Sequence, residues 1–130
     1  MAHVTVEWSE NLADDVDVPT LLRLIATEMR EHSGGVFPAG GIRVRGIRTT
    51  DYVIADGASD SDAFIDMRVL MATGRPPEFR QRFFDQLFAR VRDHLGDLFE
   101  RRPLALSLYV TEADGWKHNS IHDRLAAKPA

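Results

Sequence analysis

The sequence has no cysteine, no long apolar run and no excess of basic residues, and each absence excludes a class of function. Without cysteine, the chain cannot form disulfides, use a thiol as a nucleophile or bind metal through thiolates. Its formal net charge of −4 argues against a general role in nucleic-acid binding. No stretch reaches the roughly 18 apolar residues of a membrane-spanning helix, and no charged and then apolar leader opens the chain. We therefore expect a cytoplasmic protein with no membrane or nucleic-acid partner.

The chain length limits the number of domains. Its 130 residues are enough for one hydrophobic core and too few for two. We expect a single domain over 1–130, built from halves at about 1–56 and 62–112 and followed by a C-terminal tail. The acidic loop 55–62 between the halves is expected to be a solvated connection.

Hydrophobic periodicity predicts both strands and helices. Alternation of apolar and polar residues predicts strands at about 3–8, 42–48, 63–72 and 104–111. A first helix is expected to follow Asp17, because an aspartate cap and a proline in the first turn favour a helix start, and to end at Ser33. A second helix is predicted over about 77–100, where phenylalanine, leucine and valine form a wide apolar stripe.

The order of these elements is β-α-β followed by β-α-β. Each crossover is long enough to join two parallel strands with the right-handed connection that such units take. We therefore predict an α/β (α+β) fold in which two β-α-β units form a four-stranded sheet with two helices on one face. The uncovered face would carry apolar and mixed residues, which indicates oligomerisation. A ferredoxin-like binding module has the same element order, but its sheet would be antiparallel.

Several segments resemble a known family along nearly the whole chain. They are VEWSENL (6–12), VFPAGGIRVR (36–45), ATGR (72–75) with Arg80-Gln81, LALS (104–107) and NSIH (119–122). Their order and spacing are similar to those of the 5-carboxymethyl-2-hydroxymuconate isomerases of the tautomerase superfamily. The resemblance implies a tautomerase-like homotrimer that needs no cofactor. It also implies a 1,3-proton shift in an unsaturated hydroxy or keto diacid from aromatic-compound catabolism.

The resemblance also assigns the site. Arg43 and Arg75 match the family's active-site arginines, and a guanidinium suits a substrate with carboxylates because its planar fork binds them bidentately. Ala2 stands where the family has its catalytic N-terminal proline. A free α-amine has a pKa of about 7.7–8.0 and can act as a base near neutral pH. Ala2 would offer that amine only if Met1 is removed.

Other residues remain as alternatives at this site. His3, Glu7 and Tyr109 could carry the proton instead, and Phe37 is a possible site residue within the VFPAGG segment. A second class of function is a non-catalytic trimeric family member that binds a small carboxylate ligand after losing its base.

Two further groups of residues are assigned no part in the chemistry. His118 and His122 have the four-residue spacing of metal ligands on a helix, but no third ligand is evident, so no metal site is predicted. Arg101 and Arg102 are expected to be surface or interface charges.

Overall fold

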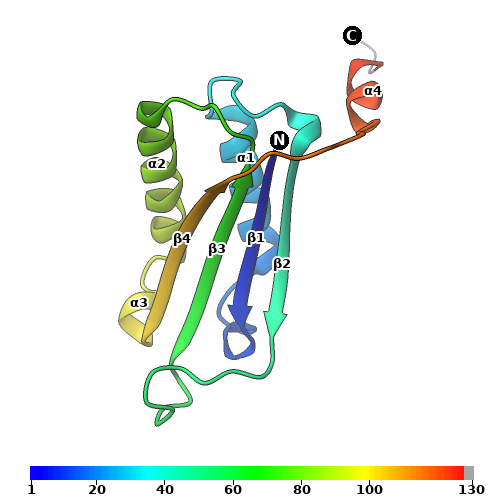
Figure 1. Ribbon diagram of the computed structural model, residues 1–130. Helices are drawn as coiled ribbons and strands as arrows, with labels where there is room; N and C mark the ends of the chain where they lie inside the picture. The colour runs from blue at the N-terminus through cyan, green and yellow to red at the C-terminus, as the bar shows by residue number, and fades with distance from the viewer. Residues whose placement is uncertain (128–130) are drawn as a thin grey trace.

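The structure, a computed structural model that describes residues 1–127, is built on one four-stranded sheet (Figure 1). Its strands are β1 (Ala2–Ser9), β2 (Ile42–Thr49), β3 (Ala63–Met71) and β4 (Leu104–Glu112). They lie in the order β2-β1-β3-β4. β1 is parallel to β2, β3 is parallel to β4, and the two pairs meet antiparallel at β1 and β3.

This topology confirms the predicted fold class. Each parallel pair is joined through a helix, as expected for two β-α-β units. The ferredoxin-like alternative is excluded, because β1 and β2 are neighbours and run parallel. Within residues 1–127, no helix combines the length and the apolar character needed to cross a membrane.

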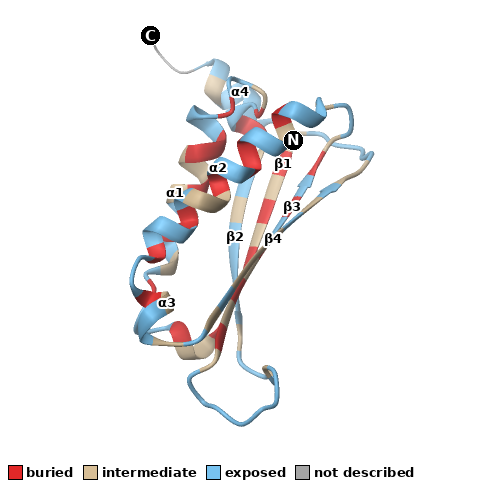
Figure 2. Cartoon of the chain, turned by 90° about the vertical axis from the view of Figure 1, so that its left-hand side faces the viewer, coloured by how far each residue is buried: buried red, intermediate tan, exposed pale blue. Residues whose placement is uncertain are grey.

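Two long helices cover one face of the sheet. They are α1 (Val18–Glu31) and α2 (Pro77–Leu95), and the buried residues gather between them and the strands (Figure 2). The Asp17 side chain accepts a hydrogen bond from the Thr20 amide at 3.2 Å, so the predicted aspartate cap is confirmed. Alternate residues of β1 and β3 face these helices and are almost fully buried, as the period of two requires.

The second predicted helix is shorter than expected. Instead of running over 77–100, it ends at Leu95, and a separate turn of helix, α3 (Leu98–Arg101), follows. Gly96 has a φ of +57°, which a residue with a side chain adopts only at a cost, and its amide donates to the Arg92 carbonyl at 3.1 Å. The prediction was wrong because the apolar stripe continues across this break.

Three short elements complete the described chain. They are the 3₁₀ helices η1 (Glu10–Leu12) and η2 (Ala39–Gly41) and the helix α4 (Ile121–Ala126). The predicted C-terminal tail therefore contains a helix of its own. In Figure 1, α4 stands apart from the two long helices, beside η2.

The sheet face away from the helices is mixed rather than apolar. Side chains on neighbouring strands bond across it, with Arg45 donating to Thr5 at 3.3 Å and Ser107 donating to Asp66 at 2.9 Å. Leu70 and Tyr109 lie on the same face and are 39% and 59% exposed. The expectation of a face with both apolar and polar residues is confirmed.

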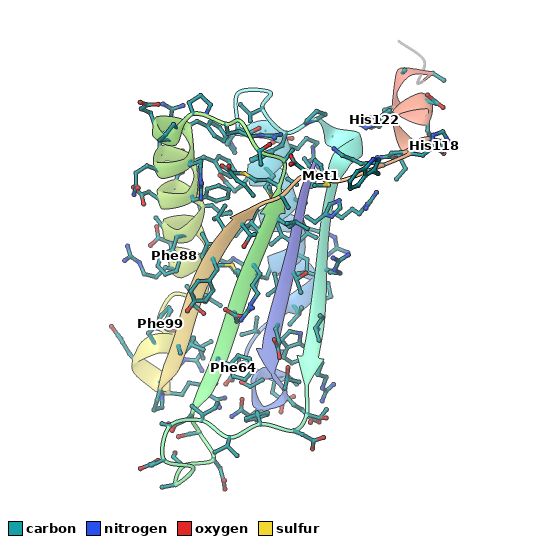
Figure 3. The ribbon with its side chains drawn as sticks, viewed as in Figure 1. Met1, Phe64, Phe88, Phe99, His118 and His122 are labelled. Atoms are coloured by element: carbon teal, nitrogen blue, oxygen red, sulfur yellow. The ribbon has the colours of Figure 1, made fainter. Side chains whose placement is uncertain are left out.

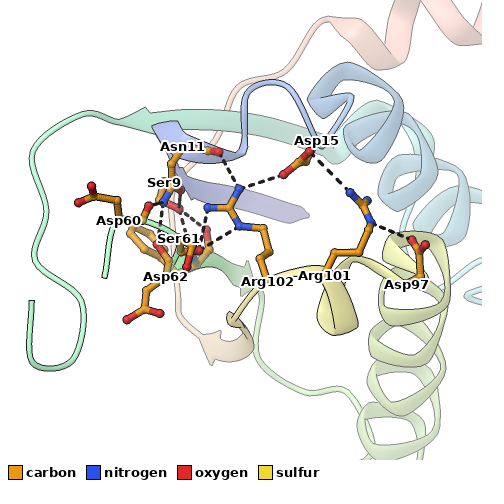
Figure 4. Close-up of polar contacts among 10 residues, drawn as sticks. Ser9, Asn11, Asp15, Asp60, Ser61, Asp62, Asp97, Arg101 and Arg102 are labelled. Carbon is orange, nitrogen blue, oxygen red and sulfur yellow. Dashed lines mark hydrogen bonds and ion pairs between the residues drawn. The ribbon is translucent and has the colours of Figure 1, made fainter. Parts of the chain in front are cut away.

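Arg102 is a structural residue and not the surface charge that was expected. Its side chain is only 12% exposed and donates to the Asn11 carbonyl at 2.9 Å and to the Ser61 carbonyl at 2.8 Å (Figure 4). It also pairs with the Asp15 carboxylate at 2.9 Å. Asn11 in turn donates to the Asp62 carbonyl at 2.7 Å. Together these bonds hold the loop before β3 against the end of β1.

We expect Arg102→Met to lower the free energy of unfolding by about 2–3 kcal/mol, because two backbone carbonyls lose a charged donor. Urea denaturation measures this change. Arg101→Met is the matched control. Arg101 is half exposed, and its ion pairs with Asp15 and Asp97 are 3.8 and 3.3 Å long, so its loss should cost less than about 1 kcal/mol. Equal losses in both variants would contradict the structural role of Arg102.

Candidate active site

A cavity of about 340 Å³ lies at the N-terminal end of β1. Its lining comes from three parts of the chain: the N-terminus, the segment from η2 into β2, and the segment after β4. In Figure 3 this last segment passes beside Met1 and carries His118 and His122. The lining residues are Met1, His3, Pro38, Gly41, Arg43, Trp116, Lys117, His118, Asn119 and His122.

The strand order determines which groups meet at this cavity. β1 is a central strand, and Ala2 pairs with Ile42 at the start of β2 and with Met71 at the end of β3. Met1 therefore lies between those two strand ends. A side chain at Gly41 would place its Cβ 3.3 Å from the Met1 Cα and 3.6 Å from the Met1 nitrogen. Because Gly41 has no side chain, there is space beside it for the Met1 backbone.

The α-amine is the first reactive group of the cavity. Partial burial lowers the pKa of the Met1 amine from its usual value of 8.0, and the charges of Arg75 and Lys117 lower it further. A lower pKa means that more of the amine is neutral near pH 7. A neutral amine has a free electron pair and can accept a proton from a substrate.

His3 and Arg43 form the second feature of the cavity. The two side chains lie on neighbouring strands at paired positions, and the Arg43 Nη1 is 3.1 Å from the His3 Nε2. Burial and the charges of Arg43 and Arg45 lower the pKa of His3, so the ring is neutral at pH 7. Since a guanidinium can only donate, Nε2 accepts this hydrogen bond and the ring proton is on Nδ1.

The cavity is cationic in a chain that is acidic overall. No aspartate or glutamate lines it, although the whole chain carries a net charge of −4. Within residues 1–127, neither Arg43 nor Lys117 has a carboxylate within 4.0 Å. Cations without a protein carboxylate nearby make this cavity suited to an anionic ligand.

Arg75 lies close to this cavity but is not one of its lining residues. It borders a second cavity of about 460 Å³ beside α2. Its guanidinium donates to the Ala72 carbonyl at 3.0 Å and lies 5.5 Å from the centre of the Phe37 ring. Its charge still lowers the pKa of the Met1 amine. In this chain the two predicted arginines therefore approach the terminus from different sides.

The other predicted site residues are placed as follows. Phe37 is 2% exposed and packs against Phe79 and Phe83 in the core. Its ring also lies beneath the Arg75 guanidinium in a cation–π contact. Tyr109 lies on the open face of the sheet, with Arg68 over its ring, and does not line the cavity. Ala2 is fully buried within β1, and with Met1 present its nitrogen is a peptide amide.

Comparison with known proteins agrees with this fold. The model of the 5-carboxymethyl-2-hydroxymuconate isomerase family matches residues 2–125. The chain is 33% identical to the 5-carboxymethyl-2-hydroxymuconate Delta-isomerase of Escherichia coli over 125 residues, which cover 94% of this chain and 97% of the relative. The chain belongs to the 5-carboxymethyl-2-hydroxymuconate isomerase family.

Solved structures support the same family. A 5-carboxymethyl-2-hydroxymuconate isomerase from Deinococcus radiodurans R1 matches with a TM-score of 0.88 and 35% identity, over 95% of this chain and 93% of that one. A fused 4-OT described as a symmetric trimer matches with a TM-score of 0.56 and 14% identity, over 90% of this chain and 95% of that one. At that identity the match shows the tautomerase-like fold alone.

The sequence did not predict that the segment after β4 lines the cavity at the N-terminus. Lys117 and Asn119 reach it from a segment that was expected to be a tail, and no periodicity indicated that this segment folds back. His118 and His122 line the cavity together with His3. Even so, no group of three His, Asp or Glu side chains within residues 1–127 is arranged to hold a metal ion.

The cations near the N-terminus should change the pKa of the Met1 α-amine. In the Met1-bearing protein, we expect the α-amine to titrate below pH 8.0 and Arg75→Ala to raise that pKa, because a neighbouring positive charge disfavours the protonated amine. The pH dependence of N-terminal acetylation rate, followed by peptide mass spectrometry, measures it. Arg82→Ala removes an exposed charge from the same helix region and should leave the pKa unchanged. A lower pKa in Arg75→Ala would contradict the assignment.

Proposed function

We propose that this chain catalyses a cofactor-free 1,3-proton shift in an unsaturated hydroxy or keto acid that bears two or more carboxylates, of the 5-carboxymethyl-2-hydroxymuconate type. The observation that carries the proposal is the cavity itself, in which the N-terminus of the chain meets Arg43 and Lys117 with no acidic residue in the lining. Family membership supports the reaction class, since the relatives named above are isomerases.

The proposed reaction uses the amine as a shuttle. The neutral α-amine takes a proton from the substrate hydroxyl or from the carbon next to the substrate carbonyl, which leaves a dienolate. It then returns the proton to the carbon two positions away. Arg43 binds carboxylate or the negative charge of the dienolate, which is larger in the transition state than in the substrate. Arg75, which borders the neighbouring cavity, adds positive charge near the terminus. His3, held by Arg43 at 3.1 Å, orients that guanidinium and is a second candidate for carrying the proton.

The amine that serves in this reaction is that of Ala2 after loss of Met1. Removal of Met1 would take one residue of about 3.8 Å from the cavity and make the Ala2 nitrogen the free amine. The new terminus would stay beside the start of β2, because Ala2 pairs with Ile42. A primary amine in this place differs from the family's proline in being unconstrained by a ring, so we expect it to be a slower base.

A second candidate function is carboxylate binding without turnover. It is favoured by Ala2 at the position of the proline, and the cationic lining fits it equally well. We also propose a homotrimer for either function, supported by the mixed open face of the sheet and by the fold shared with a protein described as a symmetric trimer.

The test is a UV assay of ketonisation of 2-hydroxymuconate by protein whose N-terminus has been defined by mass spectrometry. We expect turnover from the form that begins at Ala2, at least tenfold less from the form that keeps Met1, and a higher rate from Ala2→Pro, because only a correctly placed amine can reach the proton.

Two controls separate the candidate functions. Acetylation of the α-amine should abolish turnover, and full activity after acetylation would rule out the amine as base. Arg43→Ala should weaken inhibition by a dicarboxylate roughly tenfold or more, the loss of a charge-assisted contact. Binding without turnover in both the native chain and Ala2→Pro would favour the binding function.

A further inference from the structure

The segment between β4 and α4 crosses the N-terminus as a strap that is fastened at both ends. We define the strap as residues 113–119. At its start the Ala113 amide donates to the Met71 carbonyl at 2.9 Å, and the Thr73 hydroxyl donates to Asp114 at 3.2 Å. At its end the Asn119 side chain donates to the Gly40 carbonyl at 2.7 Å. The strap therefore runs from the end of β3 to η2.

A second contact fixes the far end of the strap. The His122 ring packs directly over Gly40, so closely that a Cβ on residue 40 would overlap the His122 Nδ1. Within the same turn, the Ile121 amide donates to the Asn119 side chain at 2.9 Å. Lys117 lies two residues before this attachment, so its backbone has a defined place over the cavity.

Lys117 can bind an anion through its ammonium group, and no carboxylate of residues 1–127 pairs with it. Its side chain lines the cavity with Arg43, and within residues 1–127 it has no carboxylate within 4.0 Å. Arg43 comes from β2 and Lys117 from the strap, so the two charges enter the cavity from separate parts of the chain. Two separated cations match a ligand with two separated carboxylates.

We propose that Lys117 binds the second carboxylate of the substrate and makes this site selective for diacids over monoacids. This inference rests on the proposed function, because it assigns the second carboxylate of the same substrate class. In it Arg43 binds one carboxylate, the strap supplies the charge for the other, and the reacting carbons lie between them beside the amine.

The test compares two six-carbon probes that differ by one carboxylate, adipate and hexanoate, by isothermal titration calorimetry. We expect the native chain to bind adipate more tightly. Lys117→Met should weaken adipate binding roughly ten- to a hundredfold, as for a lost charge-assisted hydrogen bond, and change hexanoate binding less than about twofold. Lys117→Arg keeps the charge and should retain most of the preference for adipate.

Two further variants act as controls. Arg124→Met removes an exposed charge from α4, outside the cavity, and should bind both probes as the native chain does. Gly40→Ala forces the His122 ring away and loosens the strap, so it should reproduce the selective loss of adipate binding while Lys117 is still present. Gly115→Ala, where a Cβ meets no atom within 4 Å, should not.

The outcomes distinguish this inference from the proposed function. If Lys117→Met keeps the native preference while Arg43→Ala loses both probes, the anion site stands and the role of Lys117 is overturned. If the native chain binds neither probe, both the anion site and the role of Lys117 are overturned. If Lys117→Met loses both probes equally, Lys117 supplies general attraction and not selectivity, which also overturns the inference.

Discussion

The pairing of β1 with strands on both sides is the constraint on which the rest of the site depends. Because β1 is central and begins at Ala2, its first residue is held by Ile42 on one side and Met71 on the other. The terminus is thereby brought to the start of β2 and the end of β3. Arg43, one residue into β2, and Arg75, four residues after β3, are near the terminus for this reason alone.

The site balances charge in an unusual way for an acidic chain. Cations gather at the terminus, while carboxylates such as Asp15 and Glu112 pair with arginines elsewhere, namely Arg102 and Arg80. Placing like charges together costs free energy, and an anionic ligand would offset that cost. Burial and the charges of Arg75 and Lys117 lower the pKa of the Met1 amine, so the cations nearest the terminus also favour its neutral form.

The sequence was sufficient for the fold because the fold depends on local periodicity. Alternation in β3 and the aspartate cap of α1 are properties of neighbouring residues, and both were predicted correctly. The strap, by contrast, depends on Asn119 meeting Gly40, which lies 79 positions away. Arg102 was likewise expected to be a surface charge, because its hydrogen bonds to the carbonyls of Asn11 and Ser61 join residues far apart in the sequence. Arg43, which the family resemblance assigned to the site, lines the cavity, and only the three-dimensional structure shows that Arg75 borders a different one.

The connection between β2 and β3, residues 50–62, has two parts that are held to the rest of the chain to different degrees. Its second part is pinned, since the carbonyls of Asp60, Ser61 and Asp62 all accept side-chain hydrogen bonds from Asn11 or Arg102. Its first part is open to solvent, and Val53 there is 83% exposed. Foreign sequence, a label or new chain ends could be introduced around Val53 without disturbing β3, whereas the same insertion next to Ser61 would break the attachment. The chain thus has a natural point for engineering at the end of the molecule opposite the cavity (Figure 1).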